Sequence, residues 1–464
     1  MDALGSAPGN HMTGHTHGVA AAPEAIESAT RAPDWWVRPG LDVVDGRLRI
    51  AGRDAEALAR EHGTPLFVYD LERYRENARR FQAALGTAGI PYRLRFAMKA
   101  NPDPRVLGVF RGLGVPGSPE SVGVDACSPG EVTRALECGF RPDEISYTGT
   151  NVSERDLDVI LAADGLHLNL DSISQIERVG RRAPGRTIGI RVNPARGAGY
   201  HAGLEYSGDR PTKFGIYEDR LDEAADVAAR HGLTIDTVHF HAGSGWLAEG
   251  LQAFEAALAE ATAMARRLKA RGCPIRELNV GGGLGAPGRG HEIPVDLRAY
   301  AAVLARHVVP LGVTVTCEPG DHLAKDAGIV LAEVVAVEDR GGARFVGLDA
   351  GWNVNCGYFV YGFLQEIVPC RDPLADRTWT VEVAGHINEA HDVFAEDYPF
   401  PPVVEGEVVA ILGAGSYAEA MSSTHCLRPI APAIHLERHP SGDRHRQDGP
   451  GSDASATDAT IDFQ

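Results

Sequence analysis

Several residues in the middle of the chain carry groups suited to one kind of chemistry, and each ends or follows an apolar stretch. They are Lys99, His241 with Ser244, the run Gly281, Gly282 and Gly283, and Glu318. A lysine amine can form an imine, an imidazole can stack on a flat ring, and a glycine run can bring backbone N–H groups close to a phosphate. A carboxylate can pair with the nitrogen of a pyridine ring. Together the residues predict a binding site for pyridoxal 5′-phosphate (PLP), attached through Lys99.

Each of these residues also has an ordinary structural interpretation. Lys99 could be a surface lysine at a strand end, His241 a hydrogen-bonded core residue, and Glu318 the start of a turn before Pro319. The glycine run could be a turn or a Rossmann loop. No strand–helix–strand unit opens the chain with such a loop, however, and barrels often bind phosphate after their seventh and eighth strands. We favour the PLP site because all of these residues occur together.

The elements that would position these residues are eight short apolar runs separated by stretches with helical spacing. The runs are Leu94–Met98, Val122–Ala126, Glu144–Thr148, Leu166–Leu170, Ile188–Val192, Thr237–His241, Leu278–Val280 and Val313–Cys317. This alternation predicts an α/β fold, a (β/α)₈ TIM-like barrel, in which chemistry gathers at the C-terminal ends of the strands. The long segment Asn193–Tyr217 follows the fifth strand at that end, and a loop of such length is usually functional.

The domain organisation follows from changes in residue type along the chain. We expect the PLP-binding barrel over residues 67–328 and a mostly antiparallel C-terminal β domain over residues 329–436, where β-branched runs alternate with Gly, Asp and Pro. Residues 34–66 are expected to join the β domain from the N-terminal side. Residues 1–33 and 437–464 lack core-forming patterns and are expected to be a disordered leader and tail.

The composition excludes some partners. The net charge of −18 over 464 residues disfavours nucleic acid or an anionic membrane as a main partner. No stretch approaches the roughly 20 apolar residues that a membrane span needs, and no secretory signal is recognisable. The seven scattered cysteines indicate a reducing, cytoplasmic location. No metal site is predicted.

The order and content of the motifs resemble the fold-type III PLP-dependent decarboxylases, the diaminopimelate and ornithine decarboxylase family, over about residues 34–436. The segments that carry the resemblance are Phe96–Asn101, Val124–Glu131, Thr212–Ile216, His241–Ser244, Gly281–Gly283, Glu318–Gly320, Gly415–Tyr417 and Arg428–Pro429. It implies an alanine-racemase-like barrel in which Lys99 is the Schiff-base lysine, His241 stacks on the ring and Glu318 pairs with the pyridine nitrogen. Phosphate contacts would come from Ser244, Gly283 and Tyr417.

The remaining predicted site residues are Asp125, Arg191, Gly281, Gly282 and Gly320 toward the cofactor, Tyr361, Glu389 and Asp392 toward the substrate, and Asn388 and His391 as catalytic residues. The resemblance also implies a head-to-tail homodimer with shared active sites. Residues Asn388, Glu389 and Asp392 would then act across the interface.

The sequence departs from the family in three places. Asn388 stands where the family has a proton-donating cysteine, and an amide is no acid, so His391, His386, Tyr417 or water would have to donate. Asp321 replaces an arginine after Glu318-Pro319-Gly320. Gly357 stands where diaminopimelate enzymes have an arginine near their substrate.

The predicted function is PLP-dependent decarboxylation of an amino acid. The retained Glu389 fits a distal amine, whereas the lost arginine argues against meso-diaminopimelate. A basic or modified amino acid, from specialised metabolism, is therefore the expected substrate. An amino-acid racemase or epimerase and a catalytically silent regulatory homologue are the alternatives.

Overall fold

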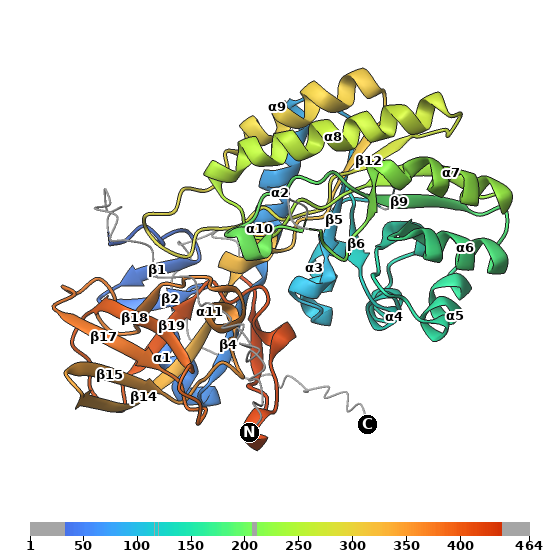
Figure 1. Cartoon of the computed structure of the whole chain (residues 1–464). Helices are drawn as coiled ribbons and strands as arrows, with labels where there is room; N and C mark the ends of the chain where they lie inside the picture. The colour runs from blue at the N-terminus through green and yellow to red at the C-terminus, as the bar shows by residue number, and fades with distance from the viewer. Residues whose placement is uncertain (1–32, 116, 119, 207–210, 439–464) are drawn as a thin grey trace, which may run out of the picture.

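The computed structural model describes residues 33–438 apart from residues 116, 119 and 207–210. Two domains lie side by side in Figure 1, a barrel with its helices and a β domain. The N-terminal strands, drawn in blue, lie among the orange and red strands of the β domain. Most of the expected leader and tail falls outside the described residues.

Eight parallel strands close the barrel. They are β5 (Tyr92–Ala97), β6 (Val122–Ala126), β7 (Ile145–Tyr147), β8 (His167–Leu170), β9 (Thr187–Asn193), β11 (Thr234–His239), β12 (Glu277–Asn279) and β13 (Thr314–Cys317). Each pairs with its neighbour, and β13 pairs with β5 to complete the ring. The short β10 (Ile216–Tyr217) pairs in parallel with the end of β9. The predicted fold class is confirmed, and each of the eight strands overlaps its predicted run, although β5 and β11 begin two and three residues earlier than predicted.

The helices that surround the barrel bury one apolar face, and all of them except α7 and α8 begin at a polar side chain that caps the first turn. They are α2 (Leu71–Thr87), α3 (Pro104–Arg111), α4 (Pro129–Glu137), α5 (Glu154–Ala162), α6 (Ile173–Arg182), α7 (Leu221–Arg230), α8 (Leu251–Ala270) and α9 (Leu297–Val308). Ser128, Ser153 and Ser172 accept backbone N–H groups at the starts of α4, α5 and α6. None of the helices among the described residues is long and apolar enough to span a membrane.

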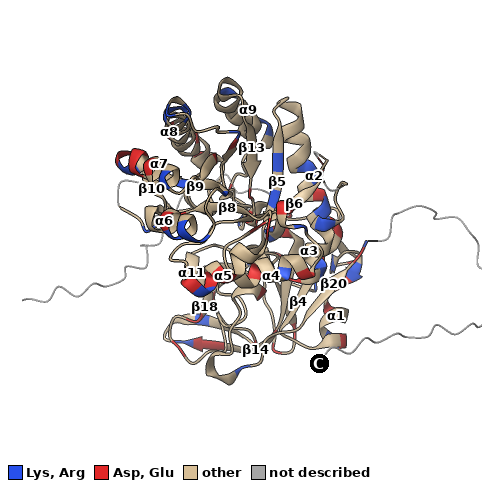
Figure 2. Cartoon of the chain, turned by 90° about the vertical axis from the view of Figure 1, so that its right-hand side faces the viewer, with Lys and Arg blue, Asp and Glu red and all other residues tan. Residues whose placement is uncertain are grey.

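Charged residues of both signs cover the outer helices (Figure 2). The acidic face of α7 lies beside basic residues of α8, where Arg267 Nη2 is 2.6 Å from Asp222 Oδ2. Such exposed pairs contribute little to stability, typically about 0–1 kcal/mol each. The helices are held on the barrel by their apolar faces, such as Ile176 and Val179 on α6.

The β domain is a mixed, mostly antiparallel sheet. Its strands are β14 (Gly328–Arg340), β15 (Ala343–Leu348), β16 (Ile367–Pro369), β17 (Trp379–Ala384), β18 (Val393–Phe400), β19 (Val408–Leu412), β20 (Ala433–Leu436) and β4 (Leu66–Asp70). The sequence did not indicate β16 and β18, which form the two ends of the main strand order and carry prolines that edge strands tolerate. A second core lies between this sheet and the N-terminal β1 (Leu41–Val44), β2 (Arg47–Ile50) and α1 (Ala55–His62).

Strand β4 ties the two domains together. It pairs antiparallel with β14 and parallel with β20, and α2 of the barrel begins directly after it. The boundary expected after residue 66 therefore falls inside β4, because the strand runs on in the β sheet to Asp70. The end of the β domain is also ordered beyond residue 436. Glu437 pairs with Arg75 at 2.8 Å, so the expected tail does not begin at 437.

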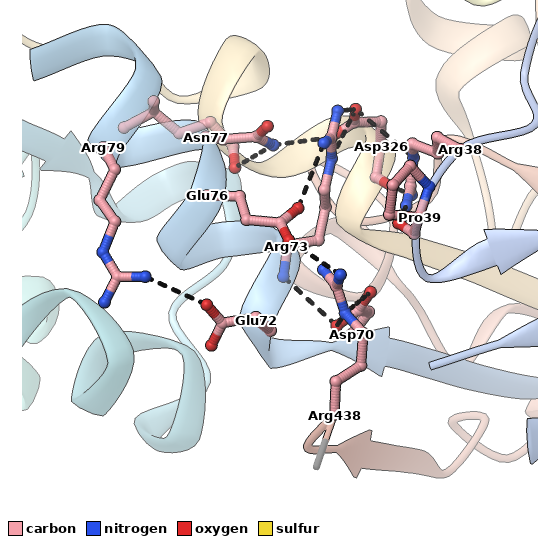
Figure 3. Close-up of polar contacts among 11 residues, drawn as sticks. Arg38, Pro39, Asp70, Glu72, Arg73, Glu76, Asn77, Arg79, Asp326 and Arg438 are labelled. Carbon is pink, nitrogen blue, oxygen red and sulfur yellow. Dashed lines mark hydrogen bonds and ion pairs between the residues drawn. The ribbon is translucent and has the colours of Figure 1, made fainter. Parts of the chain in front are cut away.

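A network of charged side chains fills the junction between the domains (Figure 3). Asp326, which precedes β14, accepts hydrogen bonds from Asn77 at 2.7 Å and from Arg73 Nε at 3.0 Å, both on α2. Arg38 of the N-terminal segment lies 3.8 Å from the same carboxylate. Arg438 pairs with Asp70 at 3.0 Å and with Glu76 at 2.8 Å. Burial by itself would raise the pKa of Asp326, but the two guanidinium groups and Asn77 outweigh it and hold that pKa well below its usual range.

We expect the substitution Asp326→Asn to lower the free energy of unfolding by about 1–3 kcal/mol, since it leaves Arg38 and Arg73 without their shared anion. The loss should be smaller than for a fully buried pair because about 34% of the Asp326 side chain is exposed. Urea unfolding measures it, with Asp339→Asn, which removes an exposed pair with Arg344, as the matched control.

The pH dependence gives a second check on this network. A carboxylate whose pKa is depressed by folding stabilises the fold above its unfolded pKa of about 3.9, and this contribution is lost as the pH falls. The difference between wild type and Asp326→Asn should therefore be largest near neutral pH and shrink below about pH 4. A difference that does not change with pH would contradict the assignment.

Candidate active site

A cavity of about 240 Å³ lies at the C-terminal ends of the barrel strands, closed on one side by the β domain. The predicted site residues that line it are Lys99, Asp125, Arg191, His241, Ser244, Gly282, Gly283, Glu318, Gly320, Tyr361 and Tyr417. The barrel therefore brings together residues that are more than 300 positions apart in the sequence. Gly281 and the β-domain residues Asn388, Glu389, His391 and Asp392 are not among the lining residues of their own chain.

Lys99 reaches the cavity because a short 3₁₀ turn, Met98–Ala100, follows β5. Its neighbours Met98 and Ala100 are buried in the core, which fixes the turn, while the Lys99 side chain is open to the cavity. The carbonyl of Ala100 accepts a hydrogen bond of 2.8 Å from the backbone N–H of Tyr417. The turn that carries the lysine is thus tied directly to the β-domain segment that carries the tyrosine.

Glu318, at the end of β13, is held as a buried carboxylate. Its Oε1 accepts hydrogen bonds from Asn279 at 2.6 Å and Ser146 at 2.7 Å, and its Oε2 lies 3.4 Å from Nε2 of His239. Burial acts to raise the pKa of Glu318, but the hydrogen bond from His239 and the positive charge of Arg95 outweigh it and lower the pKa to about 2. The barrel thus supplies a permanent negative charge on the cavity wall.

Asp125 lies next to this carboxylate and behaves in the opposite way. Burial and the negative charge of Glu318 raise the pKa of Asp125 well above its usual range. Ser146 Oγ is 3.1 Å from Asp125 and 2.7 Å from Glu318, and a hydroxyl has only one proton to donate. We infer that protonated Asp125 donates a hydrogen bond to the Ser146 hydroxyl, and that this hydroxyl donates to ionised Glu318.

His241 is a neutral imidazole with a free donor. Burial and the positive charge of Lys99 lower the pKa of His241 well below its usual range. Its Nδ1 accepts the N–H of Gly282 at 3.3 Å, so the proton is on Nε2, which has no hydrogen-bond partner among the described residues. A buried donor without a partner next to a cavity is a feature that a bound group can satisfy.

The three glycines after β12 differ in their roles. The N–H of Gly281 donates to the side chain of Asn279, and that of Gly282 donates to His241, so of the three only Gly283 has a backbone N–H without a partner among the described residues. The expectation that all three amides approach a phosphate is thus reduced to one. All three positions nevertheless require glycine, since an added Cβ would lie 2.8, 2.2 and 2.0 Å from neighbouring atoms.

Two hydroxyl groups of cavity-lining residues have no protein partner among the described residues. Ser244 Oγ and Tyr417 Oη both belong to lining residues and donate to no described residue. Tyr417 has φ +51°, a left-handed conformation that is uncommon outside glycine and places its ring over Gly320, where an added Cβ would lie 2.9 Å from the hydroxyl. Two hydroxyls and one backbone N–H that line the same cavity and have no partner among the described residues suit a phosphate group, so the residues present fit PLP.

Two of the β-domain residues predicted near the substrate have protein partners. Asp392 is buried, and its oxygens accept the N–H groups of Trp352 at 2.7 Å and Ile387 at 2.6 Å, which fixes the loop after β17. Glu389 lies between two imidazoles, 3.0 Å from Nε2 of His391 and 3.0 Å from Nε2 of His425. Asn388 and His391 are exposed on the same loop.

Sequence reasoning assigned no role to several residues of the site, among them His239, Ser146 and Asn279 around Glu318, and Tyr206 and Phe214 on the cavity wall. The first three lie inside barrel strands and give no motif. A signal did exist for Tyr206 and Phe214, because both lie in the long segment after the fifth strand that was expected to be functional. Tyr206 packs at 5.0 Å from the His241 ring and 4.9 Å from Phe214.

Residues 71–325 match the family model of the pyridoxal-dependent decarboxylases, pyridoxal binding domain. The chain belongs to this family. It is 37% identical over 401 residues to a diaminopimelate decarboxylase of Methanothermobacter thermautotrophicus, covering 84% of this chain and 91% of the relative. A diaminopimelate decarboxylase of Streptomyces coelicolor is 32% identical, covering 83% and 87% of the two chains.

Solved structures agree with this assignment. The crystal structure of diaminopimelate decarboxylase from Helicobacter pylori complexed with L-lysine superposes with a TM-score of 0.76 at 27% identity, covering 83% of this chain and 95% of that one. The protein is therefore a fold-type III PLP-dependent carboxy-lyase. Its cofactor is PLP, for which Lys99, Glu318, His241, Gly283, Ser244 and Tyr417 provide fitting groups.

We expect Lys99→Ala to abolish covalent attachment of PLP, measured by mass spectrometry after borohydride reduction, whereas Lys269→Ala on the outer face of α8 keeps it.

Glu318→Gln should retain attachment but lower kcat by about a hundredfold or more, because the fixed charge on the cavity wall is lost. Attachment at another lysine, or an undiminished kcat in Glu318→Gln, would contradict these roles.

Proposed function

We propose that this enzyme decarboxylates a basic or modified amino acid of specialised metabolism, and that meso-diaminopimelate is not its substrate. The observation that carries the decarboxylase function is that Lys99 and the ionised Glu318 line one cavity at the mouth of the barrel. Against meso-diaminopimelate stand Gly357 and Asp321 at two arginine positions of the resemblance. Gly357 begins the short helix α11 (Gly357–Tyr361), and Asp321 contributes a negative charge to the cavity wall.

The roles of the residues follow from their positions. Lys99 would hold PLP through its amine, yield that bond to the incoming amino group of the substrate and take it back to release the product, and Ser244, Gly283 and Tyr417 would bind the phosphate. His241 packs against the ring, and Glu318 keeps the pyridine nitrogen protonated. When bound, PLP supplies an electron sink for the electron pair that remains on Cα as CO₂ leaves. The reaction then requires one proton at Cα, delivered by an acid on the open side of the cavity.

Two copies of the chain are proposed to assemble head to tail, each completing the other's cavity with its β domain. Supporting this, the β-domain surface around Asn388 exposes large apolar side chains. Leu427 is 95% exposed, Val360 48% and Phe359 40%. Exposed apolar side chains that cluster on one surface usually mark an interface.

His391 is proposed as the acid that replaces the missing cysteine. Glu389 orients both His391 and His425, and the two imidazoles flank a stack of aromatic rings: His391 lies 4.7 Å from Phe359, Phe359 lies 5.2 Å from Trp352, and Trp352 lies 4.9 Å from His425. The exposed His391 side chain could enter the cavity of a second copy, whereas His386 is bonded to Asn353.

A panel of L- and D-amino acids tests the function. We expect CO₂ release from one or more basic or modified amino acids and little from meso-diaminopimelate, measured by trapping of labelled CO₂. Inversion at Cα without CO₂ release would instead identify a racemase. Efficient turnover of meso-diaminopimelate would refute the substrate proposal.

Mixing two inactive variants tests the shared site. Lys99→Ala and His391→Gln are each expected to be nearly inactive alone, but in a mixed dimer one of the two cavities regains both residues. A random mixture should then recover about a quarter of the wild-type activity, because half of the dimers are mixed and each has one intact site. If His391 acts within its own chain, mixing restores nothing.

The product distribution tests the proton-donor role separately. His391→Gln should increase protonation away from Cα, after which hydrolysis by water would release an aldehyde in place of the amine. His307→Gln, which removes a comparable histidine 3.1 Å from Glu255 on the outer helices, is the matched control. An unchanged ratio of aldehyde to amine in His391→Gln would remove His391 from this role.

A further inference from the structure

Asp321 is a buried carboxylate on the cavity wall without an ionic partner. Its side chain belongs to a residue that is 8% exposed, and it lines the same cavity as Lys99. It accepts hydrogen bonds from the hydroxyl of Ser416 at 2.6 Å and from the N–H of Ala286 at 3.3 Å. No basic side chain among the described residues lies within ion-pair distance. A buried carboxylate with two neutral donors is under-compensated, and a cation is the group that satisfies it best.

The basic residues nearest in sequence to Asp321 are engaged elsewhere. Lys325, one helical turn further on, donates to the carbonyl of Ala286 at 2.9 Å and lies 5.1 Å above the ring of Phe363. His322 contacts the carbonyl of Gly285 at 3.1 Å, and burial lowers the pKa of His322, which keeps it neutral. The charge of Asp321 therefore acts on other groups in the cavity. Burial is the main reason why the pKa of Tyr417 is raised, and the negative charge of Asp321 is the second.

Aromatic rings form much of the cavity wall that Asp321 shares. Tyr361 lies 5.3 Å from Phe363 and 6.4 Å from Tyr417, and all three line the cavity together with Tyr206. Ring faces attract organic cations, and ring bodies pack against methylene groups. One carboxylate and several aromatic rings make a surface suited to an alkyl chain that ends in an ammonium or guanidinium group.

We propose that Asp321 determines substrate specificity by pairing with a cationic group at the far end of the substrate side chain and repelling a carboxylate there. This inference rests on the proposed decarboxylase function and adds the residue that recognises the substrate side chain. The discrimination comes from one charge. A distal cation on the substrate would compensate the charge of Asp321, whereas a distal carboxylate would be repelled by it.

A purely structural role for Asp321 makes a different prediction. If the carboxylate only joins Ser416 to Ala286, then its replacement changes stability or the amount of bound PLP for all substrates equally. Asp321→Asn keeps an acceptor for Ser416 and removes the charge. The ratio of kcat/KM between two substrates therefore separates the two roles.

The experiment compares three amino acids of similar length in the PLP-loaded enzyme: L-lysine with a distal ammonium, L-norleucine with a distal methyl, and L-2-aminoadipate with a distal carboxylate. We expect the wild type to prefer L-lysine. In Asp321→Asn the preference for L-lysine over L-norleucine should fall by about ten- to a hundredfold, the usual effect of losing a charge-assisted hydrogen bond. Asp321→Arg should shift the preference toward L-2-aminoadipate.

Asp349→Asn is the matched control. Asp349 also accepts one hydroxyl, from Thr64 at 2.5 Å, and one backbone N–H, from Glu333 at 2.8 Å, but it does not line the cavity. Its replacement should leave the substrate ratios unchanged. If Asp321→Asn does not fold, Asp321→Ser, which keeps a polar side chain of smaller size, takes its place.

The outcomes separate the two levels of the proposal. If the wild type releases CO₂ from no member of the wider amino-acid panel, the decarboxylase function itself fails. If it releases CO₂ but prefers L-norleucine or L-2-aminoadipate, or if Asp321→Asn changes PLP affinity and leaves the substrate ratio as in the wild type, the specificity role of Asp321 is overturned while the function stands.

Discussion

The site depends on one buried carboxylate that stays ionised. Glu318 is almost completely shielded from water, where a lone carboxylate would take up a proton. It remains charged because Asn279, Ser146 and His239 donate to it from three other strands. A closed barrel is the arrangement that lets four strands converge on one atom group in this way. Asp125 is forced to hold its proton, since two neighbouring anions would repel each other.

The β domain matters because the barrel by itself leaves the cavity incomplete. Tyr361 and Tyr417 come from the β domain, and the backbone of Tyr417 is bonded to the turn that carries Lys99. Strand β4 and the charged junction around Asp326 keep the two domains in one relative position (Figure 3). If the junction were weakened, the β domain with Tyr417 could shift relative to the barrel with Lys99. The junction therefore contributes to function by keeping these residues in place.

Prediction succeeded where chemistry is local and failed where it depends on partners across the fold. The eight strands were predicted from apolar runs, because each is buried on both faces between barrel interior and helices. The edge strands β16 and β18 gave no such pattern, since β16 has only 3 residues and β18 contains the exposed Glu396 and Asp397. Gly281 and Asp392 illustrate the same limit: the sequence offers an amide and a carboxylate, but the fold binds them to Asn279 and to two backbone N–H groups.

The sequence by itself determined the barrel and its site residues Lys99, Gly281–Gly283 and Glu318. Each of these features is encoded by a short run of residue types and by its place in the strand order. Tertiary structure alone decided which carboxylate is charged, which amide has no partner in the described part of the chain, and that Asp321 lines the cavity with no basic partner there. Those properties depend on burial and on neighbours from distant strands, and neither can be read from adjacent residues.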